Sequence, residues 1–107
     1  MPLGNIFSIL RDADDPDLPI FEFDPVKSAA NRAKHGIDFV EAQALWLDDR
    51  LLEVPARFTR ELRFLVIGRI GRRYWSAIVT HRGTRVRLIS VRRARFEEVV
   101  EYDRRRV

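Results

Sequence analysis

The sequence predicts an α+β domain with a mainly antiparallel β-sheet, two N-terminal helices and one C-terminal helix, in the order β-α-α-β-β-β-β-α. Three observations support this. Helix-start and helix-stop residues frame two short segments within residues 24–47. Extended segments with short Gly-containing connections fill residues 51–93. An amphipathic segment over residues 95–105 begins with acids and ends with arginines.

The first two elements follow from local signals. Ile20–Phe23 alternates apolar and polar residues, which is typical of a short strand. Asp24 and Pro25 suit the N-cap and first position of a helix that reaches Lys34, and Gly36 ends it because glycine adopts the left-handed conformation. A strand and a helix of about three turns are therefore expected.

The second helix begins after a tight corner. Asp38 and Glu41 have the spacing of a capping box, and Phe39–Trp46 supplies an apolar helical face. The strands expected after it are Leu51–Pro55, Arg63–Ile70, Tyr74–His81 and Arg85–Arg93. The last helix places Phe96, Val99, Val100 and Asp103 on one face.

Composition predicts one domain, residues 20–107, after a flexible acidic leader over residues 1–19. The chain contains no cysteine, no run long and apolar enough for a membrane span, and no signal-peptide pattern, so we expect a cytoplasmic protein. The histidines and acids do not have the spacing of metal ligands. The glycines at 68 and 71 lie in a strand and a hairpin, whereas a nucleotide-binding loop lies between a strand and a helix. No cofactor and no metal site are expected.

Positive charge is concentrated in one part of the chain. Residues 1–56 contain 11 acidic and 5 basic residues, whereas residues 57–95 contain 12 arginines and one acid, Glu61. Arginine suits phosphate oxygens and stacks on bases, so a polyanion is the expected partner. Arg69, Arg87 and Arg93 alternate with apolar strand residues and are candidates for RNA binding. The alternative is that carboxylates of the N-terminal half, the leader included, neutralise these arginines.

Two further features are candidates for chemistry. Glu61 lies among cations, which favour its charged form, so it is either a base or the partner in an ion pair with a neighbouring arginine. Lys34 and His35 present a cation and an imidazole at a helix end, where His35 can equally cap the last carbonyls. His81 beside Arg82 is weak evidence by itself.

Residues 21–102 resemble the BrnT-type toxins of bacterial type II toxin–antitoxin systems. The markers are, in order, Phe21-Glu22-Phe23-Asp24-Pro25 with Lys27 and Asn31, Lys34-His35-Gly36-Ile37, Phe39-x-Glu41-Ala42, Glu61-x-Arg63, Ile67-Gly68, Thr80-x-Arg82-Gly83, Arg87-Leu88-Ile89-Ser90-x-Arg92-Arg93-Ala94, Glu98 and Tyr102. The family usually has Trp where Phe23 stands and an aromatic residue where Val79 stands, and it usually lacks the leader before Leu18. His81 falls at a position that the family pattern leaves free.

The resemblance implies a RelE-like fold and a metal-independent endoribonuclease that cleaves messenger RNA, on or off the ribosome, and inhibits translation. Catalytic candidates on motif positions are Lys34, His35, Glu61, Arg63, Arg82 and Arg92. Attack of a ribose 2′-OH on the adjacent phosphate needs a base, cations for the phosphate and a proton for the 5′ oxygen. The hypothesis is that Glu61 or His35 is the base, that the three arginines hold the phosphate, and that Lys34 or His35 assists the leaving group.

The resemblance also implies a BrnA-like antitoxin that covers the basic surface and through which alone the pair binds operator DNA. Three alternatives stay open. A non-catalytic RNA- or ribosome-binding module would show salt-dependent binding without cleavage. A structural subunit would pair the arginines with an acidic protein. A DNA-binding regulator is disfavoured, because the sequence has no basic recognition helix.

Overall fold

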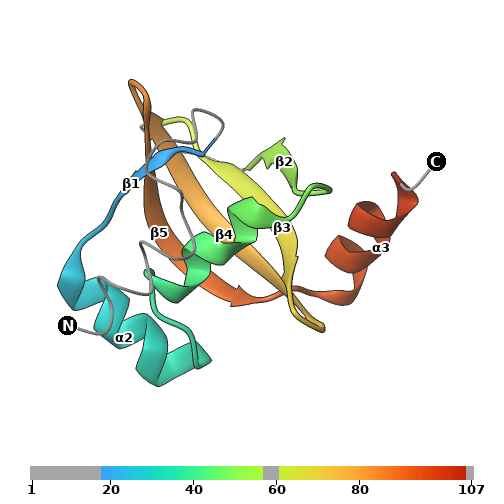
Figure 1. The fold of residues 1–107 in the computed structure, drawn as a ribbon, viewed down its shortest axis with the longest axis horizontal. Coiled ribbons are helices and arrows are strands. Elements are labelled where there is room, and N and C mark those ends of the chain that lie inside the picture. The colour runs from blue at the N-terminus through green and yellow to red at the C-terminus, as the bar shows by residue number, and fades with distance from the viewer. Residues whose placement is uncertain (1–17, 57–60, 106–107) are drawn as a thin grey trace.

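A five-stranded sheet in the order β1-β5-β4-β3-β2 forms the centre of the molecule (Figure 1). The computed structural model describes residues 18–56 and 61–105, so the predicted acidic leader lies almost entirely outside the described residues. The elements are β1 (Ile20–Glu22), α2 (Pro25–His35), η1 (Glu41–Leu47), β2 (Leu52–Pro55), β3 (Phe64–Ile70), β4 (Arg73–Arg82), β5 (Arg85–Arg93) and α3 (Phe96–Arg104). β1 runs parallel to β5 and the other neighbours are antiparallel, which confirms the predicted α+β class and element order.

The ends of α2 form as its sequence predicts. The Asp24 carboxylate accepts a hydrogen bond from the Val26 amide at 2.8 Å, satisfying one of the free donors of the first turn. Gly36 has φ 81°, and its amide donates to the Arg32 carbonyl at 2.9 Å. The chain therefore leaves the helix in the left-handed turn that favours glycine.

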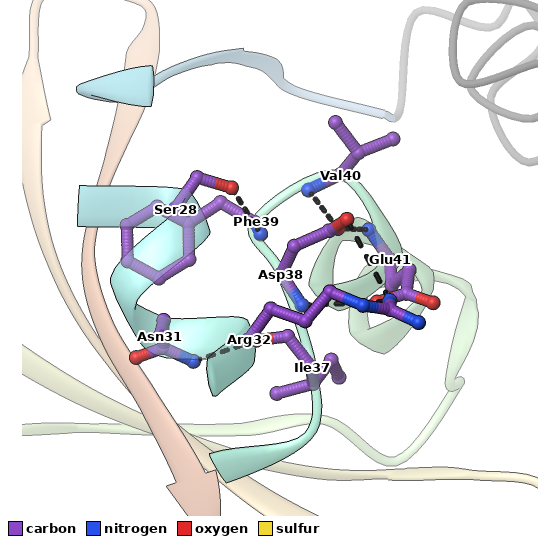
Figure 2. A network of polar contacts seen from close by, with 8 residues as sticks. All are labelled: Ser28, Asn31, Arg32, Ile37, Asp38, Phe39, Val40 and Glu41. Atoms are coloured by element: carbon purple, nitrogen blue, oxygen red, sulfur yellow. Dashed lines mark hydrogen bonds and ion pairs between the residues drawn. The ribbon is translucent and has the colours of Figure 1, made fainter. Parts of the chain in front are cut away.

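The predicted second helix is present, but it is a 3-10 helix, η1, rather than an α-helix. Its capping box forms: Asp38 Oδ1 accepts from the Glu41 amide at 2.7 Å, and Glu41 Oε1 accepts from the Asp38 amide at 3.0 Å (Figure 2). η1 lies very close to β3 at Gly68, where a Cβ atom would come within 3.1 Å of Leu45 and 2.7 Å of Leu51. A larger residue here would push the ends of these two leucine side chains aside, so glycine favours the close packing.

The hydrophobic core lies between the sheet and the two helices, α2 and η1, that cover one of its faces (Figure 1). Alternation along β3, β4 and β5 sends one set of side chains inward. The fully buried members of this core are Phe39, Ala42, Leu45, Val66, Ala77, Val79, Leu88 and Val91. Val79 is therefore a packing residue, as is Phe23, whose ring meets Phe39 edge-on.

Helix α3 packs on the rest of the protein with a different face from the apolar one that the sequence predicts. Phe96 is 82% exposed and Val100 is also exposed, whereas Glu98 and Tyr102 are buried. Both buried side chains are held by hydrogen bonds to distant polar residues, so α3 docks mainly through polar groups. The side chain that hydrophobic periodicity would bury first, Phe96, is therefore almost fully exposed.

Candidate functional site

The arginines and their neighbours gather at two opposite ends of the sheet. The β4–β5 end consists of Glu61–Arg63 and Thr80–Arg87, and the α3 end consists of Arg69–Ser76 and Arg92–Tyr102. Ser76 pairs with Arg92 and lies six residues before Arg82 on β4, so the two ends are about 20 Å apart at roughly 3.3 Å per residue.

The predicted catalytic residues divide between these ends. Glu61, Arg63 and Arg82 lie at the β4–β5 end. Arg92 lies at the α3 end, and Lys34 and His35 lie in the last turn of α2, which contacts β5 next to Arg92 through hydrogen bonds to Val91. The six residues therefore form two groups rather than one.

At the β4–β5 end, hydrogen bonds from both sides hold the segment Glu61–Arg63. The Ala56 amide donates to the Arg63 carbonyl at 2.9 Å, and the buried Thr80 hydroxyl donates to the Leu62 carbonyl at 2.9 Å. The segment thus extends the β2–β3 ladder and is fixed against β4. In the sequence, Thr80 was noted only as one of the residues that resemble the family. Its contact with Leu62 could not be predicted, because the two residues are 18 positions apart.

The turn between β4 and β5 places two arginines directly opposite each other. Arg82 pairs with Arg85 across the ladder, and Gly83 with φ 61° makes the tight turn between them. Both are exposed, and neither has a carboxylate partner among residues 18–56 and 61–105. Like charges directly opposite on neighbouring strands are destabilising, and a bound anion would remove that cost.

The remaining charges of this end are loosely paired. Arg63 Nη2 lies 3.5 Å from Glu61 Oε2, and both side chains are about two-fifths exposed. Arg87 Nη1 lies 3.3 Å from Glu22 Oε2 across the β1–β5 pair. An exposed pair such as Arg63 with Glu61 contributes about 0–1 kcal/mol, so these two side chains can exchange partners readily. The pair of Arg87 with Glu22 is partly buried.

A histidine–carboxylate pair that the sequence did not single out lies at the same end. His81 Nε2 lies 2.8 Å from Glu53 Oε2, and the imidazole meets the Phe64 ring edge-on with centroids 5.0 Å apart. The pair links β4 to β2, strands that are separated by β3. The sequence did not identify Glu53 as a candidate, because its partner, His81, is 28 residues away along the chain.

At the α3 end, by contrast, the arginine is fully engaged. Arg92 donates from both terminal nitrogens to the two oxygens of Glu98 at 2.8 Å each. Glu98 also accepts from the Ser76 hydroxyl and the Arg95 amide at 2.8 Å each. The pKa of Glu98 is lowered to about 2, chiefly by the hydrogen bond from Arg92. Burial acts in the opposite direction, and the bonds from Arg95 and Ser76 add to the lowering.

A second carboxylate network lies beside it. Asp48 accepts from the Tyr102 hydroxyl at 2.7 Å and from the Arg69 and Arg50 amides at 2.9 Å each. Burial alone would raise the pKa of Asp48, but these hydrogen bonds hold it below its usual value. Burial and the nearby carboxylate raise the pKa of Tyr102 to about 12.

The two remaining candidates for RNA binding stack on aromatic rings at the α3 end. The Arg69 guanidinium lies 5.2 Å from the centre of the Tyr74 ring, and the Arg93 guanidinium lies 5.5 Å from the centre of the Trp75 ring. Cation–π contacts of this kind orient a guanidinium without neutralising it. These two arginines therefore keep their charge available.

The corner that carries Lys34 and His35 is rigid. Asn31 donates to the Ile37 carbonyl at 2.8 Å, and the Ser28 hydroxyl accepts from the Phe39 amide at 2.9 Å (Figure 2). Asn31 also donates to the Val91 carbonyl at 2.9 Å. These bonds attach α2 to the following corner and to β5. Lys34 itself is exposed, and His35 is half-buried.

No three histidine, aspartate or glutamate side chains within residues 18–56 and 61–105 are grouped as metal ligands. None of the helices in that part of the chain has the length and apolar character needed to cross a membrane.

A family model described as the ribonuclease toxin, BrnT, of a type II toxin–antitoxin system matches residues 23–98. The match includes the whole β4–β5 end, the α3 end up to Glu98, and all six predicted catalytic residues. No curated protein matches the chain.

Proposed function

Because the chain belongs to the BrnT family of ribonuclease toxins of type II toxin–antitoxin systems, we propose that it cleaves RNA without a metal at the β4–β5 end. The observation that supports this location is the pair Arg82 and Arg85, which face each other without a carboxylate partner among the described residues. A phosphodiester between them would neutralise charge that the fold leaves opposed. Glu61 and Arg63 lie alongside.

The chemistry follows from these side chains. Glu61 accepts the proton of the ribose 2′-OH, and the 2′ oxygen attacks the adjacent phosphorus. Arg63 and Arg82 stabilise the charge that develops on the phosphorane oxygens, a contribution of about 3–4 kcal/mol for each well-placed donor. The products are a 2′,3′-cyclic phosphate and a 5′-hydroxyl.

The other predicted catalytic residues have different roles in this proposal. Arg92 positions α3, because both of its terminal nitrogens are bonded to Glu98. Lys34 and His35 contact phosphates farther along the RNA, since they lie on α2, which is bonded to β5 at Val91 rather than at the β4–β5 end. Arg69, Arg87 and Arg93 add charge along the same path.

The test is cleavage of single-stranded RNA in EDTA by the wild type, Glu61→Gln, His35→Ala and Arg92→Ala. We expect Glu61→Gln to be slower by about 100-fold, the lower range for loss of a general base, with smaller losses in the other two. Full activity in all three variants would overturn the mechanism. Salt-dependent binding of RNA by the wild type without any product would instead favour a non-catalytic binding module.

We further propose that a BrnA-like antitoxin covers the β4–β5 end with acidic groups and that free toxin inhibits translation. The opposed arginines support this, because they would attract a carboxylate as well as a phosphate. Induction of the chain should arrest growth, and co-expression of the antitoxin should restore it. Operator binding should require the antitoxin, so a strong gel shift by this chain alone would contradict the proposal.

A further inference from the structure

We propose that the acidic segment, residues 12–17 of this chain, binds Arg82 and Arg85 and competes there with RNA. This inference rests on the proposed function and assigns a regulator to its RNA-binding end. The acidic segment contains four aspartates and no basic residue. Arg82 and Arg85 are exposed cations with no carboxylate partner among residues 18–56 and 61–105. The charges of the two regions are therefore complementary.

The strand register connects the acidic segment to the fold beside these arginines. β1 begins at Ile20, which is paired with Arg85 across the parallel β1–β5 ladder. Arg85 is in turn paired with Arg82 on β4. Asp17 precedes Ile20 by three residues, which span at most about 10 Å. Because neighbouring strands lie about 4.8 Å apart, both arginines are within reach of the aspartates.

The attachment point of the acidic segment and both arginines lie on the same face of the sheet. Phe21 is paired with Val86, and both pack into the core. Because side chains alternate along a strand, Ile20 and Arg85 point away from the core. Ile20 is accordingly exposed, and Arg82 shares this face because it is paired with Arg85. This is the face on which the proposed phosphate lies.

β1 already supplies a carboxylate to the next arginine along β5. Glu22 Oε2 lies 3.3 Å from Arg87 Nη1, and the pair is partly buried. These two residues are register partners and lie two positions beyond the pair of Ile20 with Arg85. Ile20 cannot neutralise Arg85 in the same way, because its side chain is apolar. Carboxylates from the residues just before Ile20 would take that role.

Covalent attachment makes a weak contact sufficient. Exposed ion pairs contribute little to stability, so a separate peptide with this acidic sequence would bind the arginines poorly. A group attached a few residues from its target acts at an effective concentration on the order of 1 mM. A contact that occupies the arginines about nine-tenths of the time lowers the RNA affinity about tenfold. The acidic segment thus weakens RNA binding without preventing it.

Neutralising the aspartates in the full chain tests the competition. The variant combines Asp14→Asn, Asp15→Asn and Asp17→Asn. At low salt it should bind an uncleavable 2′-O-methyl RNA about tenfold more tightly than the wild type, because the arginines are then free. High salt should remove the difference, since ionic screening weakens exposed pairs.

The matched control changes the net charge by the same amount elsewhere. It neutralises three exposed carboxylates, with the substitutions Asp49→Asn, Glu97→Gln and Glu101→Gln. We expect a much smaller gain in RNA affinity from the control. Equal gains in the two variants would overturn the proposal, because net charge alone would then explain both.

Removing the arginines should remove the effect of the aspartates. In a chain that carries Arg82→Ala and Arg85→Ala, the three aspartate substitutions should change the RNA affinity by less than about twofold, the range for independent sites. A tenfold gain in that background would overturn the proposal. In cleavage assays of the otherwise wild-type chain, the aspartate substitutions should lower KM and leave kcat unchanged, because bound RNA has already displaced the acidic segment.

The most direct test needs no RNA cleavage. The chain contains no cysteine, so Ala13→Cys gives a single site for a nitroxide spin label within the acidic segment. The label should broaden the amide signals of Arg82 and Arg85 far more than those of Ser76 and Arg92, and the 2′-O-methyl RNA should restore them. RNA binding without broadening at Arg82 and Arg85 would overturn only this inference. Failure of the wild type and the aspartate variant to bind RNA would overturn the proposed function and the competition with it.

Discussion

The two ends of the sheet carry similar side chains in opposite states. At the α3 end, Arg92 is bonded to both oxygens of a buried carboxylate, Glu98. At the β4–β5 end, Arg82 and Arg85 are exposed, opposed and without a carboxylate partner in the described part of the chain. The difference lies in the acids available: Glu98 neutralises Arg92 at one end, whereas no carboxylate pairs with Arg82 or Arg85 among the described residues at the other.

This difference divides the arginine-rich region into a structural part and a proposed functional part. A partly buried, hydrogen-bonded ion pair fixes the docking of α3, and removing one partner would leave the other charge partly buried and unpaired. The unpaired arginines form no stabilising ion pair with the described residues of the free protein, so their proposed role is to bind an anionic partner.

The largest effect should come from removing both opposed arginines. Arg82→Ala combined with Arg85→Ala should slow RNA cleavage by about 100-fold or more, because donors to the phosphorane are lost. The melting temperature should stay the same or rise, since a like-charge contact disappears. Cleavage kinetics and thermal unfolding measure the two quantities. Arg104→Ala, which removes an exposed arginine of α3, is the matched control; equal loss in both would show that net charge alone matters.

The α3 end should respond in stability instead. Glu98→Gln weakens the pairing of Arg92, and we expect a loss of about 2 kcal/mol in the free energy of unfolding, below the range for fully buried pairs because some solvent reaches Arg92. The melting temperature should fall by about 10 °C. Cleavage per folded molecule at low temperature should be retained. A selective loss of activity in a fully stable variant would assign Arg92 to the phosphate after all.

Much of the fold could be predicted because its signals are local. The cap at Asp24, the left-handed Gly36 and the capping box of Asp38 with Glu41 each involve residues within a few positions of one another, and all three form. The docking of α3 could not be predicted, because Tyr102 bonds to Asp48 from 54 residues away.

The candidate site was only partly predictable for the same reason. Composition identified an arginine-rich region but could not show which arginines are neutralised, since that depends on carboxylates brought in from other elements. Glu53 reaches His81 only because β2 and β4 flank the start of β3. The grouping of Glu61 with Arg82 likewise depends on strand register.

Acid should destabilise the α3 end through Glu98. Its folded pKa of about 2 lies below the ordinary value of 4.5, so it contributes stability above the ordinary value that is lost as pH falls through the folded value. We expect the difference in unfolding free energy between the wild type and Glu98→Gln to shrink as pH decreases from about 4.5 toward 2. Urea unfolding at several pH values measures it, and a difference independent of pH would contradict the role of this carboxylate.

The smallest expected effect is on the salt dependence of binding. Arg85→Ala should reduce the slope of log affinity against log salt by about 0.7 for single-stranded RNA, the value for one lost phosphate contact. Arg104→Ala should leave the slope unchanged. Fluorescence titration with an uncleavable 2′-O-methyl RNA gives both slopes, and equal slopes for the wild type and Arg85→Ala would remove Arg85 from the binding site.

The location of the RNA on the sheet is the central claim, and amide chemical shifts measured with the same 2′-O-methyl RNA test it most directly. The account predicts the largest shifts at Glu61–Arg63 and at Thr80–Arg87, with small shifts at Ser76, Arg92 and Glu98. Large shifts confined to the residues around Arg92 and Glu98, with the β4–β5 end unchanged, would contradict it.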